Sequence, residues 1–221
     1  MKERYSRNLG ALTEAECATL QTKKVFVAGC GGLGGHIIDM LLRVGVGSLS
    51  VADGDTFDVT NLNRQLLSNS NNIGSSKAKA AADYAKLVNP DVSFTANECF
   101  VDENNVSQLL RGCDLVMDAL DSVSARRLLK KECDRQNIPM VHGAISGWNA
   151  QVALSLPGDG LMDLLYPNQL EASGKSSLSC TPALCASLQV SVAVRYLCGR
   201  EVRSSEVLFA DLSDLLFERM F

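Results

Sequence analysis

Glycines are concentrated in one short stretch of the chain, at a spacing that suits phosphate binding. Residues 29–35 read GCGGLGG, in which Gly29, Gly31 and Gly34 form the pattern G-x-G-x-x-G and Gly32 adds a further glycine. Glycine allows the backbone to turn tightly and to approach a phosphate closely. A helix that begins there would point unpaired N–H groups and the positive end of its dipole at the ligand. The stretch therefore predicts binding of an anionic nucleotide.

The elements on either side of these glycines must place them at the edge of a sheet. Residues 25–28 are continuously apolar, which is typical of a strand buried on both faces, and apolar residues recur at helical spacing after the glycines. A second apolar strand, over residues 48–52, ends at Asp53, nineteen residues after Gly34. A carboxylate at that place can hold a ribose hydroxyl. The pattern fits NAD, FAD and ATP equally, and glycines that serve only turns and helix packing are the simpler alternative.

A polar segment follows the second strand, at the edge where open α/β sheets bind their ligands. It runs from Asp53 to Gln65 and matches neither a strand nor a helix well. The alanine-rich helix predicted after it is capped by Ser75 or Ser76, which puts Lys77 in its first turn. A cation there opposes the helix dipole by about 0.3–1 kcal/mol, so a nearby anion would explain its position. A solvated surface lysine is the alternative.

The remaining periodicities complete an α/β chain. Further strands are predicted over residues 92–99, 114–120, 139–145, 151–156, 206–212 and 215–221, and further helices over residues 14–21, 102–111, 122–136 and 181–199. Residues 146–149 form a tight turn between two of these strands, which makes that side of the sheet antiparallel. We therefore expect a Rossmann-like three-layer α/β fold around a mixed, mostly parallel central sheet.

One domain accounts for the whole length, since the sequence contains no repeat or linker. It divides into an N-terminal arm and helix (1–23), a nucleotide-binding core (24–156), a crossover loop (157–180) and a C-terminal helix with strands (181–221). Glycine, proline and serine interrupt every periodicity in the crossover loop, and a loop of that length is usually functional or mobile.

The composition excludes several classes of protein. Hydrophobic residues make up 46% of the 221 residues, enough for a sizeable core, yet no apolar run approaches the roughly 18 residues of a membrane helix. The net charge of −4 argues against bulk affinity for nucleic acid or anionic membranes. The eight cysteines include no C-x-x-C pair and only two histidines are present, so no metal-ligand spacing occurs. With no signal-peptide pattern after Met1, we expect a cytoplasmic protein.

Six short motifs follow one another along nearly the whole chain. They are RYSRN at 4–8, GCGGLGG at 29–35, DGD at 53–55, TNLNRQ at 60–65, GSSK at 74–77 and DALDSVSAR at 118–126. Together they resemble the ThiF/MoeB/HesA family, the bacterial relatives of ubiquitin-activating enzymes. The resemblance implies that ATP and Mg²⁺ serve to adenylate the C-terminal glycine of a small ubiquitin-like sulfur carrier protein ending in Gly-Gly, with release of pyrophosphate. Thiamine and molybdopterin biosynthesis both fit, with a sulfur donor protein as a further candidate partner.

The resemblance also implies a role for each matching residue. The glycine loop would hold the triphosphate and Asp53 the ribose, with Asp55 beside it in the nucleotide site. Asp121 would help to bind Mg²⁺, and Arg7 would reach from one subunit into the nucleotide site of the other, which implies a homodimer. Four residues would grip the phosphates and the reacting carboxylate: Asn61, Arg64, Gln65 and Lys77. Their cations and Mg²⁺ would neutralise the like charges that the reaction brings together.

The cysteines depart from the pattern of the family. Typical bacterial members carry two C-x-x-C pairs for structural zinc, and this sequence has neither, so we predict no structural zinc. Cys180 stands just before Thr181 and Pro182, the predicted start of a helix, near where some relatives place a cysteine that receives the activated carrier. A helix N-terminus lowers the pKa of a thiol, which makes Cys180 a candidate catalytic residue. Cys185, one turn into a buried helix, is more typical of the core.

Three other functions fit part of the sequence. One is a nucleotide-binding scaffold that adenylates nothing, although the intact Arg64, Lys77 and Asp121 weigh against it. Another is an NAD-dependent oxidoreductase, which the glycine loop and Asp53 alone would favour. The third is the tRNA-modifying, ATP-dependent dehydratase of the same superfamily, which shares a D-x-x-D-S-V run. The acidic net charge and the absence of a basic stripe in the sequence make nucleic acid an unlikely substrate.

Overall fold

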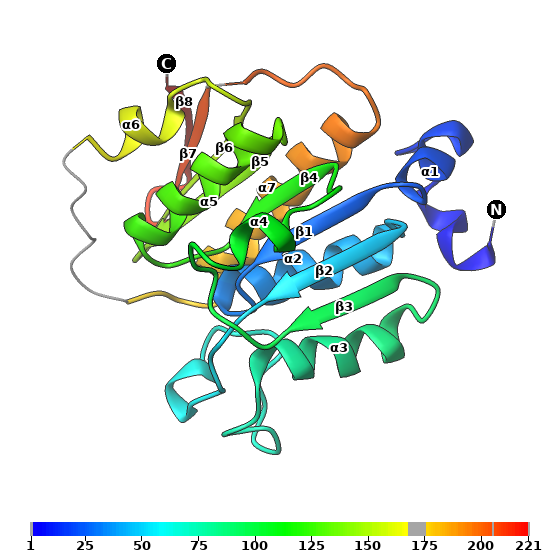
Figure 1. Ribbon diagram of the computed structural model, residues 1–221, viewed down its shortest axis with the longest axis horizontal. Coiled ribbons are helices and arrows are strands. Elements are labelled where there is room, and N and C mark those ends of the chain that lie inside the picture. The colour runs from blue at the N-terminus through cyan, green and yellow to red at the C-terminus, as the bar shows by residue number, and fades with distance from the viewer. Residues whose placement is uncertain (1, 168–175, 205, 221) are drawn as a thin grey trace.

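A sheet of eight strands, in the order β3-β2-β1-β4-β5-β6-β7-β8, runs through the middle of the protein (Figure 1). The computed structural model describes residues 2–167, 176–204 and 206–220. The strands are β1 (Lys24–Ala28), β2 (Ser48–Ala52), β3 (Ser93–Asn97), β4 (Leu115–Asp118), β5 (Met140–Ser146), β6 (Asn149–Ser155), β7 (Val207–Asp211) and β8 (Leu216–Met220). Every predicted strand is present, within a few residues of its expected ends.

The sheet is parallel on one side and antiparallel on the other. β3, β2, β1, β4 and β5 pair in parallel, whereas β6, β7 and β8 each pair antiparallel with the strand before them. Gly147, in the two-residue turn between β5 and β6, has a φ of 58°, which glycine adopts without strain. The prediction of a mixed, mostly parallel sheet is confirmed.

Helices cover both faces of the sheet, so the fold has three layers. They are α1 (Glu14–Leu20), α2 (Gly32–Val44), α3 (Lys77–Val88), α4 (Val106–Leu109), α5 (Val123–Gln136), α6 (Leu161–Leu165) and α7 (Cys180–Leu197), with short 3-10 helices η1 (Glu3–Asn8) and η2 (Val59–Asn61). One buried cluster lies between the sheet and α2, α3 and α7, and a second lies beneath α4, α5 and α6. In Figure 1, α5 lies in front of the sheet and α7 behind it.

Side-chain caps fix where several helices begin. Thr13 and Glu16 form the predicted capping box ahead of α1. The hydroxyl of Ser76 accepts from the backbone N–H of Lys79 at 3.3 Å, and that of Ser122 caps α5 in the same way. The two alternatives that the sequence left open for α3 are thus resolved in favour of Ser76.

Three elements differ from their predicted extents. The helix expected over residues 102–111 is the single turn of α4, and the strand expected to reach residue 120 ends at Asp118. Asp118 ends it because its carboxylate accepts the N–H of Leu120 at 3.1 Å, which closes a turn. The described part of the crossover segment contains α6, whose residues Leu161 and Met162 pack into the second buried cluster. Apolar burial, which the interrupted periodicity concealed, is what holds this helix.

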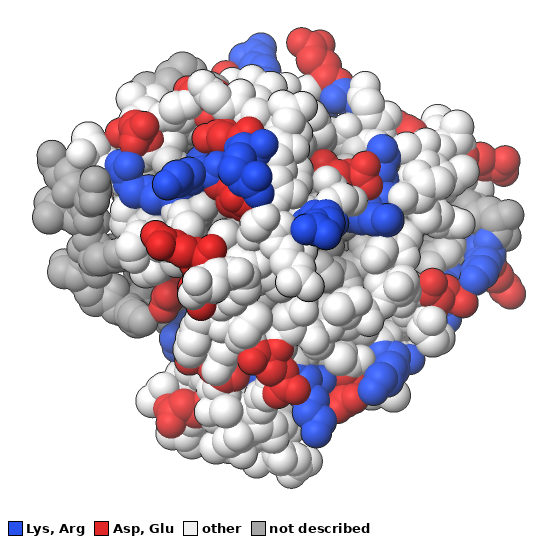
Figure 2. Space-filling view, viewed as in Figure 1, with Lys and Arg blue, Asp and Glu red and all other residues white. Residues whose placement is uncertain are grey.

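Charges of both signs are interspersed on the face of the molecule shown in Figure 2. Along α5, Arg135 pairs with Glu132 at 2.6 Å, and Arg127 pairs with Asp163 of α6 at 2.7 Å. No uniformly basic area is seen among the described residues of this face. None of the described helices is long and apolar enough to cross a membrane.

Gly34 allows α2 to start directly against the end of β1. A Cβ atom added to Gly34 would lie 1.9 Å from the carbonyl oxygen of Gly29. We predict that Gly34→Ala lowers the free energy of unfolding by about 1–3 kcal/mol or more, the scale of overpacking a core. Denaturant titration would measure it. Gly32→Ala is the matched control, because its nearest neighbour would be Pro182 at an ordinary 3.7 Å. Equal stability of the two variants would contradict the packing argument.

Candidate functional site

A cleft of about 440 Å³ lies at the carboxyl edge of the parallel strands. Its walls come from the segments that follow β1, β2, β3 and β4, from the start of α3, and from Ser176 and Ser177. It brings together nine of the predicted site residues: Gly29, Gly31, Gly32, Asp53, Asp55, Arg64, Gln65, Lys77 and Asp121. Four others, Arg7, Gly34, Asn61 and Cys180, do not line it.

Asp53 joins the glycine loop to the segment after β2. One carboxylate oxygen accepts the backbone N–H of Cys30 at 2.7 Å, and the other accepts that of Asp55 at 2.8 Å. Burial raises the pKa of Asp53, and these two N–H groups oppose the rise. Each carboxylate oxygen keeps a second lone pair, so Asp53 can hold the loop and still accept a hydroxyl of a ligand.

Lys77 meets an anion from its own chain. Its ammonium group, almost buried at the start of α3, lies 3.1 Å from a carboxylate oxygen of the more exposed Asp55. Asp55 is therefore one anion that explains the position of Lys77 in the first turn of α3. The pair holds the lysine at the cleft wall, where its remaining N–H groups can bind a ligand.

The turn after η2 presents two polar side chains that have spare hydrogen-bonding capacity. Among the described residues, Arg64 donates only to neutral oxygens, those of Thr60 at 3.0 Å and Asn63 at 2.8 Å. Gln65 is buried, and its Oε1 has no hydrogen-bond partner in the described part of the chain. A buried polar atom without a partner is costly, so a polar ligand in the cleft would stabilise it.

Asn61 supports this turn from behind the cleft wall. Its side-chain oxygen accepts the N–H of Asp58 at 3.0 Å. Its carbonyl oxygen accepts the N–H groups of Arg64 and Gln65 at 3.1 and 2.9 Å. Asn61 is therefore placed to orient its two neighbours.

Asp121 lines the cleft between the end of β4 and the start of α5. The described residues include no group of three or more histidine, cysteine, aspartate or glutamate side chains that could hold a metal ion. Mg²⁺ in nucleotide sites is typically held by one or two carboxylates together with phosphates and water. A single carboxylate at this place fits Mg²⁺ bound jointly with a nucleotide.

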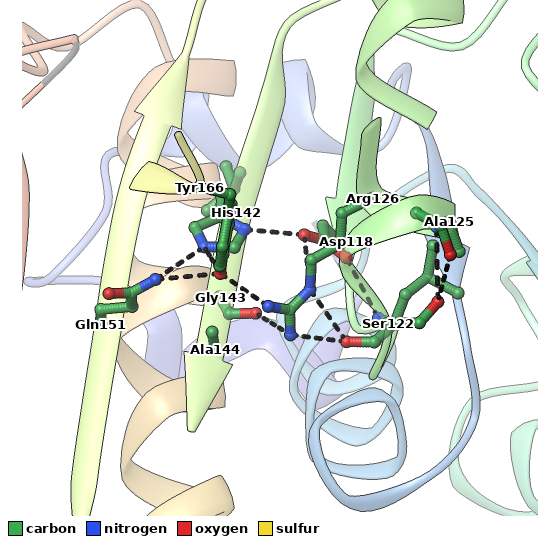
Figure 3. Close-up of polar contacts among 12 residues, drawn as sticks. Asp118, Ser122, Ala125, Arg126, His142, Gly143, Ala144, Gln151 and Tyr166 are labelled. Carbon is green, nitrogen blue, oxygen red and sulfur yellow. Dashed lines mark hydrogen bonds and ion pairs between the residues drawn. The ribbon is translucent and has the colours of Figure 1, made fainter. Parts of the chain in front are cut away.

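Arg126 also lines the cleft, although no pattern of the sequence predicted a role for it. Its guanidinium lies 3.7 Å from the carboxylate of Asp118, and both side chains are buried (Figure 3). His142 lies on the other side of Asp118, with Nδ1 at 2.7 Å. Burial lowers the pKa of His142, so the imidazole is neutral. Arg126 is the last residue of the motif at 118–126, and this position was the one indication in the sequence that it belongs to the site.

Arg7 lies far from the cleft of its own chain. The N-terminal arm docks at the far end of α2, where Asn8 donates to the carbonyl of Val44 at 3.2 Å. The 13 residues of α2 span about 20 Å, and the glycine loop is at the other end (Figure 1). The side chain of Arg7 is exposed, and no hydrogen bond or ion pair joins it to another described residue. Intramolecular contact with the nucleotide cleft is thus excluded in this structure.

Cys180 is the first residue of α7 and is exposed. The chain lines the cleft just before it, at Ser177, and approaches Gly32 just after it, at Pro182. Cys180 therefore lies near the cleft without forming its wall. Burial raises the pKa of Cys185 to about 12, which makes that thiol a poor nucleophile and suits the predicted place in the core.

The fold and the cleft define the class, a Rossmann-like α/β protein with a glycine loop at the carboxyl edge of its sheet. A family model described as the ThiF family matches residues 5–220, and the chain belongs to this family. The resemblance found in the motifs is confirmed.

Two curated relatives and one solved structure illustrate the similarity. The chain is 33% identical to the SAMP-activating enzyme E1 of Haloferax volcanii, over 98% of this chain and 83% of that protein. It is 29% identical to the molybdopterin-synthase adenylyltransferase of Escherichia coli K12, over 91% and 84% of the two chains. The crystal structure of E. coli MccB with ATP covers the whole chain, and the chain covers 71% of MccB, with a TM-score of 0.82 and 20% identity. That last likeness establishes the fold.

Proposed function

We propose that this protein is an ATP-dependent adenylyltransferase that activates the C-terminal glycine of a small ubiquitin-like sulfur carrier protein. One observation carries the proposal: the glycine loop lines the same cleft as Arg64, Lys77 and Asp121. The names of the relatives support it, since one activates SAMP and another serves molybdopterin synthase. The oxidoreductase alternative rests on the glycine loop and Asp53 alone, and membership of the ThiF family does not favour it. We place the reaction in the cytoplasm.

The proposed reaction forms one bond and breaks another. A carboxylate oxygen of the terminal glycine attacks the α-phosphorus of ATP, the bond from that phosphorus to the α,β-bridging oxygen breaks, and pyrophosphate leaves. The nucleophile is already ionised, so no general base is needed. The obstacle is repulsion between the carboxylate and the triphosphate, because both carry negative charge.

Residues of the cleft reduce this repulsion. Two positive charges lie at the wall: that of Lys77, which Asp55 holds, and that of Arg64, which donates to the neutral oxygens of Thr60 and Asn63. The glycine loop and the N-terminus of α2 add backbone N–H groups. Asp121 would hold Mg²⁺, which neutralises phosphate charge when it is bound.

The test of the proposal is exchange of labelled pyrophosphate into ATP in the presence of carrier proteins ending in Gly-Gly. Arg64→Ala, Lys77→Ala and Asp121→Ala should each lower exchange by at least about 100-fold, the scale of one lost preorganised contact. Arg43→Ala is the control, because Arg43 is an exposed arginine of α2 that pairs with Asp39 away from the cleft. It should leave exchange unchanged.

Two results would contradict the proposal. One is wild-type protein that exchanges no pyrophosphate with any such carrier. The other is a melting temperature that falls in parallel with activity in the three variants, because these residues would then be structural.

Arg7 completes the nucleotide site of a second subunit in the proposed homodimer. Its distance from its own cleft supports this arrangement. Arg7→Ala and Asp121→Ala dimers should both be nearly inactive, yet mixed dimers should each contain one site with both residues intact. Random exchange of equal amounts gives mixed dimers in about half the population, and each has one working site, so activity should recover to about one quarter of wild type. No recovery after verified subunit exchange would exclude action between subunits.

Cys180 is the proposed acceptor of the activated carrier. Its exposure supports this role, as does its place between Ser177, which lines the cleft, and Pro182, which lies beside Gly32. Cys180→Ser should leave pyrophosphate exchange nearly intact and abolish any covalent adduct with the carrier, since the thiol acts only after adenylation. Intact mass measured under non-reducing conditions would reveal the adduct. Cys185→Ser is the matched control and should keep the adduct. An adduct that persists in Cys180→Ser would show that another residue accepts the activated carrier.

A further inference from the structure

A closed ring of four side chains lies beside the wall of the cleft (Figure 3). Asp118 contacts Nδ1 of His142 at 2.7 Å, and Nε2 of His142 lies 3.2 Å from the hydroxyl of Tyr166. That hydroxyl lies 2.6 Å from Nη1 of Arg126, whose Nε lies 3.7 Å from Asp118. The four residues come from the end of β4, from β5, from the residue after α6, and from α5. The ring therefore joins two strands of the sheet to α5 and to the residue that follows α6.

The chemistry of the groups determines the direction of each hydrogen bond. The carboxylate of Asp118 can only accept, so Nδ1 of the neutral His142 must donate. Nε2 is then an acceptor, and both the Tyr166 hydroxyl and the side-chain amide of Gln151 lie 3.2 Å from it. The Tyr166 oxygen accepts from Arg126 and from Gln151. One positive and one negative charge remain, and both are paired within the ring. Hydrogen bonds linked in this way restrict the positions that the four side chains can take.

The ring holds the guanidinium of Arg126 against the turn that carries Asp121. Nε and Nη2 of Arg126 both donate to the carbonyl oxygen of Leu120, at 3.2 and 2.7 Å. The N–H of Leu120 donates to Asp118, which belongs to the same ring. Leu120 is thus held through both its N–H and its carbonyl, and the next residue is Asp121.

The guanidinium of Arg126 donates hydrogen bonds to oxygen atoms of the protein itself. Its side chain makes four with described residues: two to the carbonyl of Leu120, one to the carbonyl of Gly143 and one to the hydroxyl of Tyr166. The side chain is 9% exposed although it touches the cleft. This commitment to protein oxygens distinguishes Arg126 from Arg64, whose guanidinium is less fully engaged.

We propose that Arg126 is a positioning residue for adenylation: it holds the carbonyl of Leu120 and thereby sets where Asp121 lies in the cleft. Tyr166 and His142 act through it, because they hold the guanidinium in place. The inference rests on the proposed function for its effect on rate, and on the geometry alone for its effect on the turn. The two effects can be measured separately.

Tyr166→Phe is the decisive variant, since it removes one oxygen atom and keeps the ring of the side chain. It removes the oxygen to which Nη1 of Arg126 donates, whereas Nε2 of His142 keeps its contact with the amide of Gln151 at 3.2 Å. Tyr84→Phe is the matched control, because the Tyr84 hydroxyl also lies between an arginine and an aspartate, Arg43 and Asp39, but away from the cleft. Arg126→Lys keeps the positive charge and loses the two-pronged contact with Leu120.

The first measurement is pyrophosphate exchange at varied ATP and Mg²⁺ concentrations. Tyr166→Phe should lower kcat about tenfold, because the free energy of one hydrogen bond, added to the activation barrier, slows a reaction by about that factor. It should also raise the Mg²⁺ concentration that gives half of the maximal rate. The KM for ATP should change less than about twofold, because the glycine loop is untouched. Arg126→Lys should lower kcat further, and Tyr84→Phe should match wild type. An unchanged kcat and an unchanged Mg²⁺ dependence in both Tyr166→Phe and Arg126→Lys would overturn the proposal.

The second measurement is hydrogen exchange of the backbone amides of residues 120–122, which needs no activity. Exchange should be faster in Tyr166→Phe and Arg126→Lys than in wild type and Tyr84→Phe, with β1 and α2 unaffected. Unchanged protection of this turn would overturn the positioning role even if kcat fell. Faster exchange in a protein that adenylates no carrier would uphold the positioning of the turn and refute the proposed function alone.

Discussion

Three backbone segments meet at Gly29 with no room for a side chain, and the geometry of the cleft depends on this contact. A Cβ atom on Gly29 would lie 2.7 Å from the carbonyl oxygen of Ala119, just after β4. On the other side, a Cβ atom on Gly34 would lie 1.9 Å from the carbonyl of Gly29 itself. The start of α2 and the turn after β4 are therefore both brought against Gly29, the residue that follows β1. Larger residues would separate the glycine loop from the turn that carries Asp121.

Charges at the cleft are held in place by partners within the chain. Lys77 pairs with Asp55, Arg126 pairs with Asp118, and Asp53 accepts two backbone N–H groups. Removing a charge from water is costly unless it gains such a partner, so each pairing also restricts where its side chain can lie. A cleft whose charges are already oriented needs little reorganisation when negative charge develops in it, which is the condition for electrostatic catalysis.

The local patterns of the sequence were reliable where the physical cause was itself local. A helix cap needs a hydroxyl three residues before the N–H that it accepts from, and Ser122 meets that condition for α5. A strand buried on both faces needs a continuous apolar run, and β1 has one. The short α6 was missed because its stability comes from burying Leu161 and Met162 against other elements. A five-residue helix carries too little periodicity to be recognised alone.

The sequence by itself determined the succession of strands and longer helices along the chain, the place of the glycine loop and the family to which the chain belongs. These follow from spacings of a few residues, because caps, turns and periodic burial act over that range. Only the tertiary structure decided which partners the polar side chains take. Arg126 reaches Tyr166, 40 positions away, and Asp118 reaches His142, 24 positions away. Such contacts are set by how β4, β5 and α5 pack together, and no short-range pattern encodes them.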